Sequence, residues 1–147
     1  MTRILFQSRG APEFRFLSNF WFSPMVLDGL WYATVEHLYQ SAKAAGAERE
    51  AIRTAPTPHE ARRLGQLVAL PDSWASRRLP VMGTAVWLKF KNAELRQMLL
   101  ATDDAELVEF APWGDRFWGV DRDLVGENNL GKILMATREK IREEGKR

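Results

Sequence analysis

The sequence predicts a mostly helical α+β domain with a small β-sheet. Helix-start signals and helical apolar stripes cover most of the chain. The strand-like stretches are few and short, so they can form only a small sheet. With 147 residues, the chain has the length at which one domain with one hydrophobic core is expected. We therefore interpret residues 1–147 as a single domain.

Composition and charge exclude several classes of protein. Hydrophobic residues at 46% and charged residues at 27% are ordinary for a globular protein, and so exclude a disordered or fibrous chain. The absence of cysteine excludes disulfides, thiol nucleophiles and zinc–thiolate sites, and it suits a reducing compartment. No stretch approaches the roughly 18 apolar residues of a membrane span, and the N-terminal apolar run is too short for a signal peptide. We expect a cytoplasmic protein that does not contact membranes.

The N-terminal elements are predicted from turn and cap residues. Residues 3–8, RILFQS, read as a short strand. Residues 16–33 predict a hairpin or an ordered pair of loops, because Pro24 and an Asp28–Gly29 turn separate apolar runs. Thr34 is a suitable N-cap for a helix that runs to about Ala45, where Gly46 would end it.

The rest of the chain carries stronger helix signals. Thr57–Glu60, TPHE, combines a capping box with proline at the first helical position and predicts a helix through HEARRLGQ. Residues 80–102 predict two helical runs with Asn92 as the cap between them, and residues 105–112 predict a strand. The inward stripe of a long C-terminal helix is formed by Leu130, Ile133, Leu134, Thr137 and Ile141.

The helix predicted after Thr34 has two different faces. Glu36, Gln40 and Lys43 form a polar line on one side, well separated from the helix's apolar line, with Tyr39 between the two lines. This polar line could simply face water, with Glu36 and Lys43 at the helix ends that suit their charges. Alternatively, the neighbouring aromatic residues could exclude water from it, which would suit a carboxylate that transfers protons. The sequence leaves both alternatives open.

Several motifs occur together in an order that is familiar. FLSNF, EHLYQSAK, KFKN, FWGVD and GENNLGKILMATREKI follow one another between about Phe14 and Ile141. This pattern resembles the NADAR family of YbiA-like N-glycosidases. The resemblance implies hydrolysis of the bond between ribose C1 and the exocyclic amine of a guanine-like or pyrimidinone base. The implied substrates are early riboflavin intermediates or ADP-ribosylated guanine, so the protein would be an N-glycosyl hydrolase or an ADP-ribosylguanine hydrolase.

The resemblance also implies a set of site residues. It gives catalytic roles to Glu36, Lys43 and Asp121. The implied substrate-binding residues are Asn19, Tyr39, Gln40, Lys89, Trp118, Gly119 and Asn128. Val120 departs from the pattern, because the family commonly has glycine or another small residue there. The expected ligand is a small ribosylated base or ADP-ribosylated guanine in nucleic acid, with no cofactor. A toxin would be a partner if the protein belongs to an ADP-ribosylation system.

Two mechanisms fit these residues. In the first, a neutral Lys43 displaces the base by amine exchange and leaves a Schiff base for water to cleave, while Glu36 carries protons. Burial would favour the neutral amine that this route needs. In the second, Glu36 or Asp121 stabilises an oxocarbenium-like sugar and activates water, and Lys43 serves as a binding cation.

Two other functions are compatible with the sequence. The protein could be a non-catalytic module that binds ADP-ribose or NAD and leaves it intact. It could also be a structural or nucleic-acid-binding module, but 21 basic against 19 acidic residues give no basic stripe for that role.

The remaining histidine and tryptophan residues have simpler interpretations. The two histidines, His37 and His59, lack HxxxH spacing, so we expect no metal site and interpret His37 as a hydrogen-bonded helix residue. We expect Trp118 to stack on a flat base, and Asn128 could instead cap the last helix. The expected core anchors are Trp74, Trp87 and Trp113.

Overall fold

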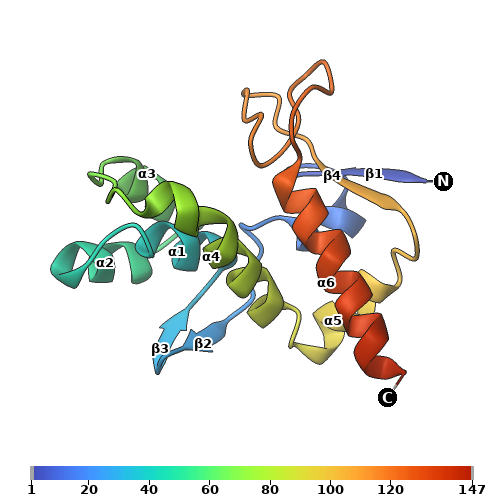
Figure 1. Cartoon of the computed structure of the whole chain (residues 1–147), viewed down its shortest axis with the longest axis horizontal. Coiled ribbons are helices and arrows are strands. Elements are labelled where there is room, and N and C mark those ends of the chain that lie inside the picture. Colours follow the sequence, from blue (N-terminus) through green and yellow to red (C-terminus); the bar gives the residue numbers. More distant parts are fainter. Residues whose placement is uncertain (1, 147) are drawn as a thin grey trace. The chain divides into compact units, whose positions relative to one another are not determined.

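Helices make up about half of the structure, a computed structural model that describes residues 2–146 (Figure 1). The described strands pair two by two into short sheets, so the predicted α+β class is confirmed. The internal contacts of the chain divide it into two compact units. The first unit contains the residues up to Ser18 and those from Phe90 onwards, and the second runs from Asn19 to Lys89.

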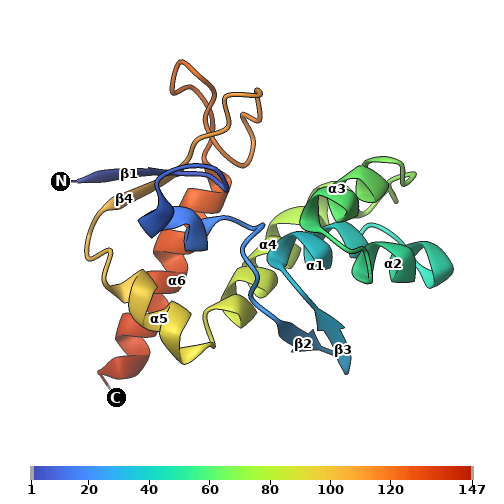
Figure 2. The same ribbon diagram turned by 180° about the vertical axis from the view of Figure 1, so that it is seen from behind.

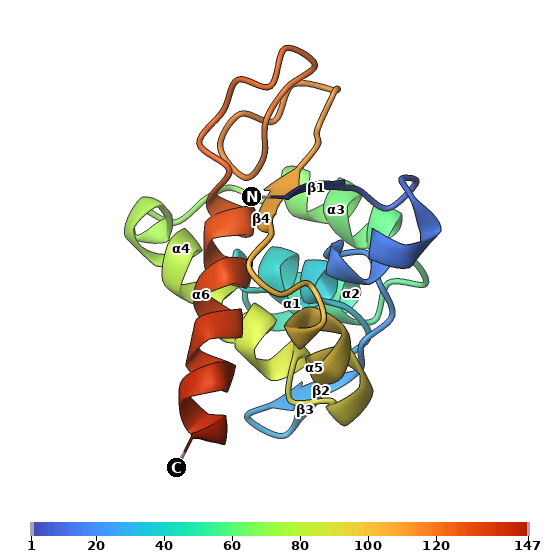
Figure 3. The ribbon, with the colours of Figure 1, turned by 90° about the vertical axis from the view of Figure 1, so that its right-hand side faces the viewer.

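The first unit is built on a parallel strand pair. Strand β1 (Arg3–Phe6) pairs with β4 (Glu106–Glu109). The strands predicted within residues 3–8 and 105–112 are therefore confirmed. A short 3-10 helix, η1 (Pro12–Leu17), follows β1. Helix α6 (Asn129–Gly145) lies along β4, and α5 (Ala93–Leu100) contacts α6 (Figure 3).

The buried face of α6 largely matches the predicted stripe. Leu130, Leu134 and Ile141 are buried, whereas Ile133 is only partly buried. Arg138 is buried on the same face, which the apolar pattern did not predict. Its guanidinium donates to Thr102 Oγ1 at 2.8 Å and to the carbonyl of Ala105 at 2.9 Å. These bonds fasten α6 to the turn that precedes β4.

The second unit begins with the predicted hairpin. Strands β2 (Met25–Leu27) and β3 (Leu30–Tyr32) are antiparallel, and β3 leads into α1 (Figure 2). Asp28 and Gly29 both have positive φ, +52° and +78°, as a type I′ hairpin turn requires. The Asp28–Gly29 turn prediction is therefore confirmed.

The remaining helices of the second unit surround α1 (Val35–Ser41). They are α2 (Gly46–Arg53), α3 (Pro58–Gln66) and α4 (Trp74–Lys89), and each contacts α1. The side chain of Thr57 accepts a bond from Glu60 N and that of Asn92 from Leu95 N, so these two predicted caps are confirmed.

The predicted end of the first helix is wrong. The helix ends at Ser41 instead of about Ala45, and Gly46 begins α2 instead of ending α1. Two short-range bonds, from Lys43 N to the carbonyl of Gln40 and from Ala44 N to that of Ser41, tighten the chain into a turn. The left-handed backbone of Gly46, at φ +58°, then directs the chain into the next helix.

Helix α4 also starts earlier than the sequence predicted. It begins at Trp74, so Pro80 lies inside the helix and not at its start. Proline cannot donate a bond to the carbonyl of Ser76. Both residues are exposed, so water can satisfy that carbonyl and the helix tolerates the proline.

Candidate active site

The first turn of α1 is fixed by hydrogen bonds. Thr34 Oγ1 accepts from His37 N at 3.1 Å, as its predicted N-cap role requires. The His37 ring nitrogens lie 2.8 Å from Thr34 Oγ1 and 2.9 Å from the carbonyl of Ala55. Because a carbonyl only accepts, Nε2 carries a proton, and His37 is the hydrogen-bonded helix residue that was predicted. The backbone N–H of Glu36 donates to the carbonyl of Asn19 at 3.1 Å.

The carboxylate of Glu36 is buried and held on one side. Glu36 is 3% exposed and Gln40 is 5% exposed, so the alternative in which the polar line faces water is wrong. Oε1 of Glu36 accepts from Gln40 Nε2 at 2.8 Å and from Arg62 Nε at 3.1 Å. Oε2 accepts no hydrogen bond from residues 2–146. One oxygen therefore orients the group while the other remains available to a ligand or water.

A glycine on α3 allows the helix to approach Gln40. A Cβ atom on Gly65 would lie 2.0 Å from Gln40 Oε1, closer than real atoms come. Any side chain at Gly65 would therefore push against the amide that holds Glu36. Gln40 Oε1 is buried and accepts no bond within the described chain.

Lys43 lies in the turn after α1 and is half-buried against aromatic rings. Its Nζ is 5.4 Å from the centre of the Tyr39 ring and 6.0 Å from that of Trp74. Burial lowers the pKa of Lys43 below its ordinary value; the negative charge of Glu36 opposes this shift and the positive charge of Arg62 adds to it. The neutral form of the Lys43 amine is therefore more favoured in this site than it would be in water.

Arg62 was not predicted as a site residue. Its guanidinium carbon lies 4.4 Å from the centre of the Phe20 ring, and that ring meets the edge of His59. Gly65 could have pointed to Arg62 in the sequence. A glycine inside a helix lowers the stability of the helix by about 1 kcal/mol and often marks a close packing contact. Arg62 precedes Gly65 by one helical turn and so lies near the same contact.

Asn19 and Lys89 also belong to the second unit. Asn19 Nδ2 lies 3.6 Å from the sulfur of Met82. Lys89 is the last residue of α4 and is 2% exposed. Burial lowers the pKa of Lys89 to about 7.

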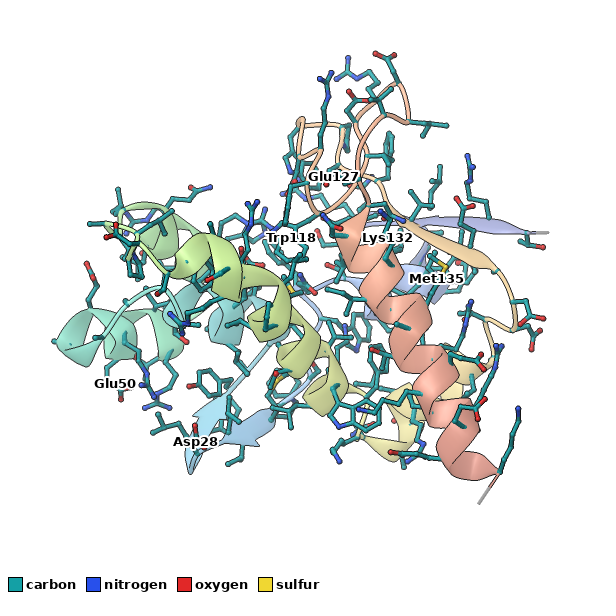
Figure 4. The ribbon with its side chains drawn as sticks, viewed as in Figure 1. Asp28, Glu50, Trp118, Glu127, Lys132 and Met135 are labelled. Atoms are coloured by element: carbon teal, nitrogen blue, oxygen red, sulfur yellow. The ribbon has the colours of Figure 1, made fainter. Side chains whose placement is uncertain are left out.

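Trp118 (Figure 4) and Gly119 belong to the first unit and lie in the loop before α6. Asp115 Oδ1 accepts from the backbone N–H of Trp118 at 2.9 Å, and the Phe117 ring meets the Trp118 ring edge-on. A Cβ atom on Gly119 would lie 2.5 Å from the carbonyl of Glu109, so the glycine lets the loop lie against β4.

Asp121 organises the same loop. Its Oδ1 accepts from the backbone N–H groups of Asp123 and Val125, and its Oδ2 accepts from Arg116 Nε at 2.7 Å. The bond from Val125 is the largest cause that lowers the pKa of Asp121, and Arg116 contributes to the same shift. Both oxygens therefore already have partners within the loop.

Asn128 stands at the N-cap position of α6, but its side chain bonds to β4. Nδ2 donates to the carbonyl of Leu107 at 2.9 Å, and Oδ1 accepts from Glu109 N at 3.0 Å. The residue also lines a cavity of about 580 Å³ whose wall includes Glu127, Lys132 and Met135 (Figure 4). The ligand-binding roles of Trp118, Gly119 and Asn128, and the catalytic role of Asp121, stay predictions.

The tryptophans predicted as core anchors differ in burial. Trp74 is buried, which confirms the prediction for that residue. Trp87 is only partly buried. Trp113 is 58% exposed, so its prediction as a core anchor is wrong. It lies in a surface turn that is closed by the bond from Gly114 N to the carbonyl of Ala111.

Neither a metal cluster nor a membrane-spanning helix occurs in the described part of the chain. Residues 2–146 contain no group of three or more His, Cys, Asp or Glu side chains that could hold a metal ion. Within the same residues, no helix is both long enough and apolar enough to span a bilayer.

Comparisons with known proteins give consistent results. The sequence profile of the NADAR domain matches residues 5–142. The chain is 40% identical over 132 residues to the N-glycosidase Npun_R5314 of Nostoc punctiforme, covering 85% of this chain and 84% of that protein. It is 36% identical over 128 residues to the chloroplastic riboflavin biosynthesis protein PYRR of Zea mays, covering 78% of this chain but 20% of that protein.

A solved structure shares the fold. The chain matches the NMR structure of the Escherichia coli protein YbiA with a TM-score of 0.87 and 37% identity. The match covers 98% of this chain and 87% of the other.

Proposed function

The chain belongs to the NADAR family, and we propose that it is an N-glycosidase that cleaves ribose C1 from the exocyclic amine of a guanine-like or pyrimidinone base. One observation carries this proposal. Glu36 is a buried carboxylate with one oxygen held and the other unoccupied, and its charge acts on a half-buried lysine. A carboxylic acid and a neutral amine are the two groups that an amine-exchange hydrolysis needs.

The covalent route uses Lys43 as the nucleophile. The C1–O4′ bond of the ribosylamine opens, with a proton from solvent going to O4′, and leaves an iminium ion that the neutral Lys43 amine attacks at C1. Glu36 takes a proton from the attacking nitrogen and donates it to the base nitrogen, so that the bond from C1 to the base breaks and the free amine leaves. Water adds to the resulting protonated Schiff base, and Glu36 moves a proton from that water to the lysine nitrogen. Lys43 then leaves, O4′ closes on C1 to give ribose, and the proton taken up at ring opening returns to solvent. The sum is one water consumed, one free base amine and one ribose hydroxyl formed.

The oxocarbenium route needs no bond to lysine. A carboxylate stabilises the sugar cation and activates water, while Lys43 binds as a cation. We assign this carboxylate to Glu36 and give Asp121 the role of ordering its loop, because the oxygens of Asp121 already accept three hydrogen bonds. The lowered pKa of Lys43 favours the covalent route.

The names of the relatives support the proposed substrate class. The Zea mays protein is named for riboflavin biosynthesis, which supports a ribosylated pyrimidinone as the substrate. ADP-ribosylated guanine, free or in nucleic acid, presents the same bond and would imply an ADP-ribosylating toxin as a partner. We place the enzyme in the cytoplasm, since a chain without cysteine suits a reducing compartment.

Incubation of the purified protein with a ribosylaminopyrimidine phosphate and with ADP-ribosylguanosine tests the proposal. We expect release of the free base from at least one of them, and a Glu36→Gln variant should lose about 10²–10⁴-fold in kcat. Glu60→Gln is the matched control, because Glu60 is a carboxylate paired with Arg63 on α3. Binding of either ligand without any base release would identify a non-catalytic module instead.

Borohydride added during turnover separates the two routes. On the covalent route it reduces the Schiff base, and peptide mass spectrometry will find the ribosyl group on Lys43. Lys43→Met should abolish the adduct, whereas the exposed Lys91→Met should retain it. An active enzyme that yields only unmodified peptide would support the oxocarbenium route.

A further inference from the structure

Two neighbouring arginines on α3 have different environments. Arg63 is a surface residue that donates to Glu60 on its own helix at 2.9 Å. Arg62 instead donates to Glu36, which lies 26 positions away on α1 and is buried. In residues 2–146 this is the one ion pair that Glu36 makes. Arg62 is therefore part of the site, and the adjacent Arg63 can serve as a surface control in mutagenesis.

The guanidinium of Arg62 is held in a defined orientation. Nε is bonded to Glu36 Oε1, and the planar group lies over the ring of Phe20. Its side chain is 37% exposed, so it stands at the boundary between the buried carboxylate and solvent. A planar, permanently charged group suits this position better than a flexible ammonium would.

We propose that Arg62 is a positioning residue for the reaction: its guanidinium, which lies over the Phe20 ring and donates to Glu36 Oε1, orients the Glu36 carboxylate and keeps a fixed positive charge at the site. This inference rests on the proposed N-glycosidase function, because only that function gives the oriented carboxylate and the Lys43 amine a task. Arg62 itself need not touch the substrate.

The charges around Lys43 set the direction of the expected effects. Burial is the largest cause that lowers the pKa of Lys43, Glu36 raises it and Arg62 lowers it. From α4, Arg77 is a further cation over the Trp74 ring that Lys43 contacts, at 5.8 Å from the ring centre. Removing Arg62 should raise the pKa of Lys43, and removing the charge of Glu36 should lower it. The neutral fraction at neutral pH then falls in the first case and rises in the second.

The first measurement does not depend on turnover. The pH dependence of reductive methylation of Lys43 by formaldehyde and cyanoborohydride, followed by peptide mass spectrometry, reports where its amine becomes neutral. We expect the labelling midpoint to move to higher pH in Arg62→Gln and to lower pH in Glu36→Gln. It should stay in place in Arg62→Lys, which keeps the charge, and in the control Arg63→Gln.

The second measurement separates geometry from charge. Arg62→Gln should lower kcat about 10–100-fold with little change in KM, and should move the rising limb of the kcat–pH profile to higher pH. Arg62→Lys should keep the position of that limb but still lower kcat, because an ammonium does not reproduce the planar contact. Arg63→Gln should match the parent protein in both respects.

The outcomes distinguish this inference from the proposed function. If the parent protein releases no base, the proposed function fails while the labelling midpoints still test the charge effect. The proposed role of Arg62 is overturned by one result in a background where the parent and Arg63→Gln are active. That result is an Arg62→Gln variant whose labelling midpoint and kcat–pH profile are both unchanged. Circular dichroism of each variant shows whether a loss of activity reflects a loss of fold, and Arg62→Lys gives the same test with the charge retained.

Discussion

Lys89 is a buried cation at the end of a helix, and its burial has a cost that depends on pH. Its side chain lies at 2% exposure, and its pKa falls from 10.5 to about 7. Between these pH values the unfolded chain binds a proton at Lys89 that the folded chain does not. The free energy of unfolding therefore rises with pH across this window, and the cost of burying Lys89 grows as the pH falls from about 10 to about 7.

We predict that Lys89→Met will flatten this dependence. The variant should gain stability relative to the parent near neutral pH, on the order of a few kcal/mol at most, and the gain should shrink towards about pH 10. Urea unfolding at about pH 7 and about pH 9.5 measures the difference. The exposed Lys132→Met is the control, and an equal pH slope in the parent and in Lys89→Met would contradict the lowered pKa.

Arg62 is an example of a site residue that its residue type alone does not identify. Arg62 and Arg63 are indistinguishable by type, yet only Arg62 meets Glu36. The choice between them follows from the buried positions Ala61 and Gly65, which set the side of α3 that faces α1. Helical periodicity could have indicated that side, but it could not name the partner.

At the scale of elements, the early end of α1 changes the geometry of the site. The sequence predicted Glu36 and Lys43 on one continuous helix, two turns apart. The helix instead stops at Ser41, and Lys43 lies in the turn that follows. Lys43 therefore reaches the Tyr39 and Trp74 rings from a turn, and its distance from Glu36 is not set by helical rise.

Two helical glycines offer a matched test of packing between α1 and α3. A methyl group on Gly83, in α4, would meet nothing within 4 Å, so Gly83→Ala should stabilise the protein by about 1 kcal/mol. A methyl group on Gly65 would overlap Gln40, which is too buried to move aside. Gly65→Ala should therefore cost about 1–3 kcal/mol and lower kcat by displacing the amide from Glu36.

Thermal or urea unfolding of both variants checks the signs of these effects. Equal stabilisation by the two substitutions would show that α3 does not press on Gln40 as described. A Gly65→Ala variant with full activity would show that the Gln40 amide does not need to hold Glu36.

At the scale of the whole molecule, the charge is nearly balanced. The formal net charge is +2, from 21 basic and 19 acidic residues. Non-specific binding to nucleic acid depends on the number of phosphates that a protein neutralises. We predict that unmodified single-stranded DNA will bind weakly, with Kd above roughly 10⁻⁶ M at physiological salt. Fluorescence anisotropy at several salt concentrations measures this, and tight binding with a steep salt dependence would favour the nucleic-acid-binding alternative.

The family assignment also belongs to this scale. It rests on a profile that matches residues 5–142 and on a fold shared over 98% of the chain, and not on any one motif. This agreement supports the transfer of the reaction type. The identity of the base is decided by individual side chains, so it needs the substrate experiments above.

The sequence by itself determined where α1, α3 and α5 start and where the hairpin turns. Thr34, Thr57 and Asn92 each accept a bond from a backbone N–H three residues later, and the Asp28–Gly29 turn depends on its own backbone angles. These signals are local, because the atoms involved are held within one turn of each other by the chain. They could be recognised without knowing the rest of the fold.

The tertiary structure alone decided that Glu36 and Gln40 are buried and that Arg62 is the partner of Glu36. Both depend on α2, α3 and α4 packing around α1, which brings together residues that are up to 26 positions apart. The same packing determines which of the two arginines reaches the carboxylate. Burial and charge pairing depend on what surrounds a side chain in the folded protein. The residue type alone does not say whether a polar side chain is surrounded by helices or by water.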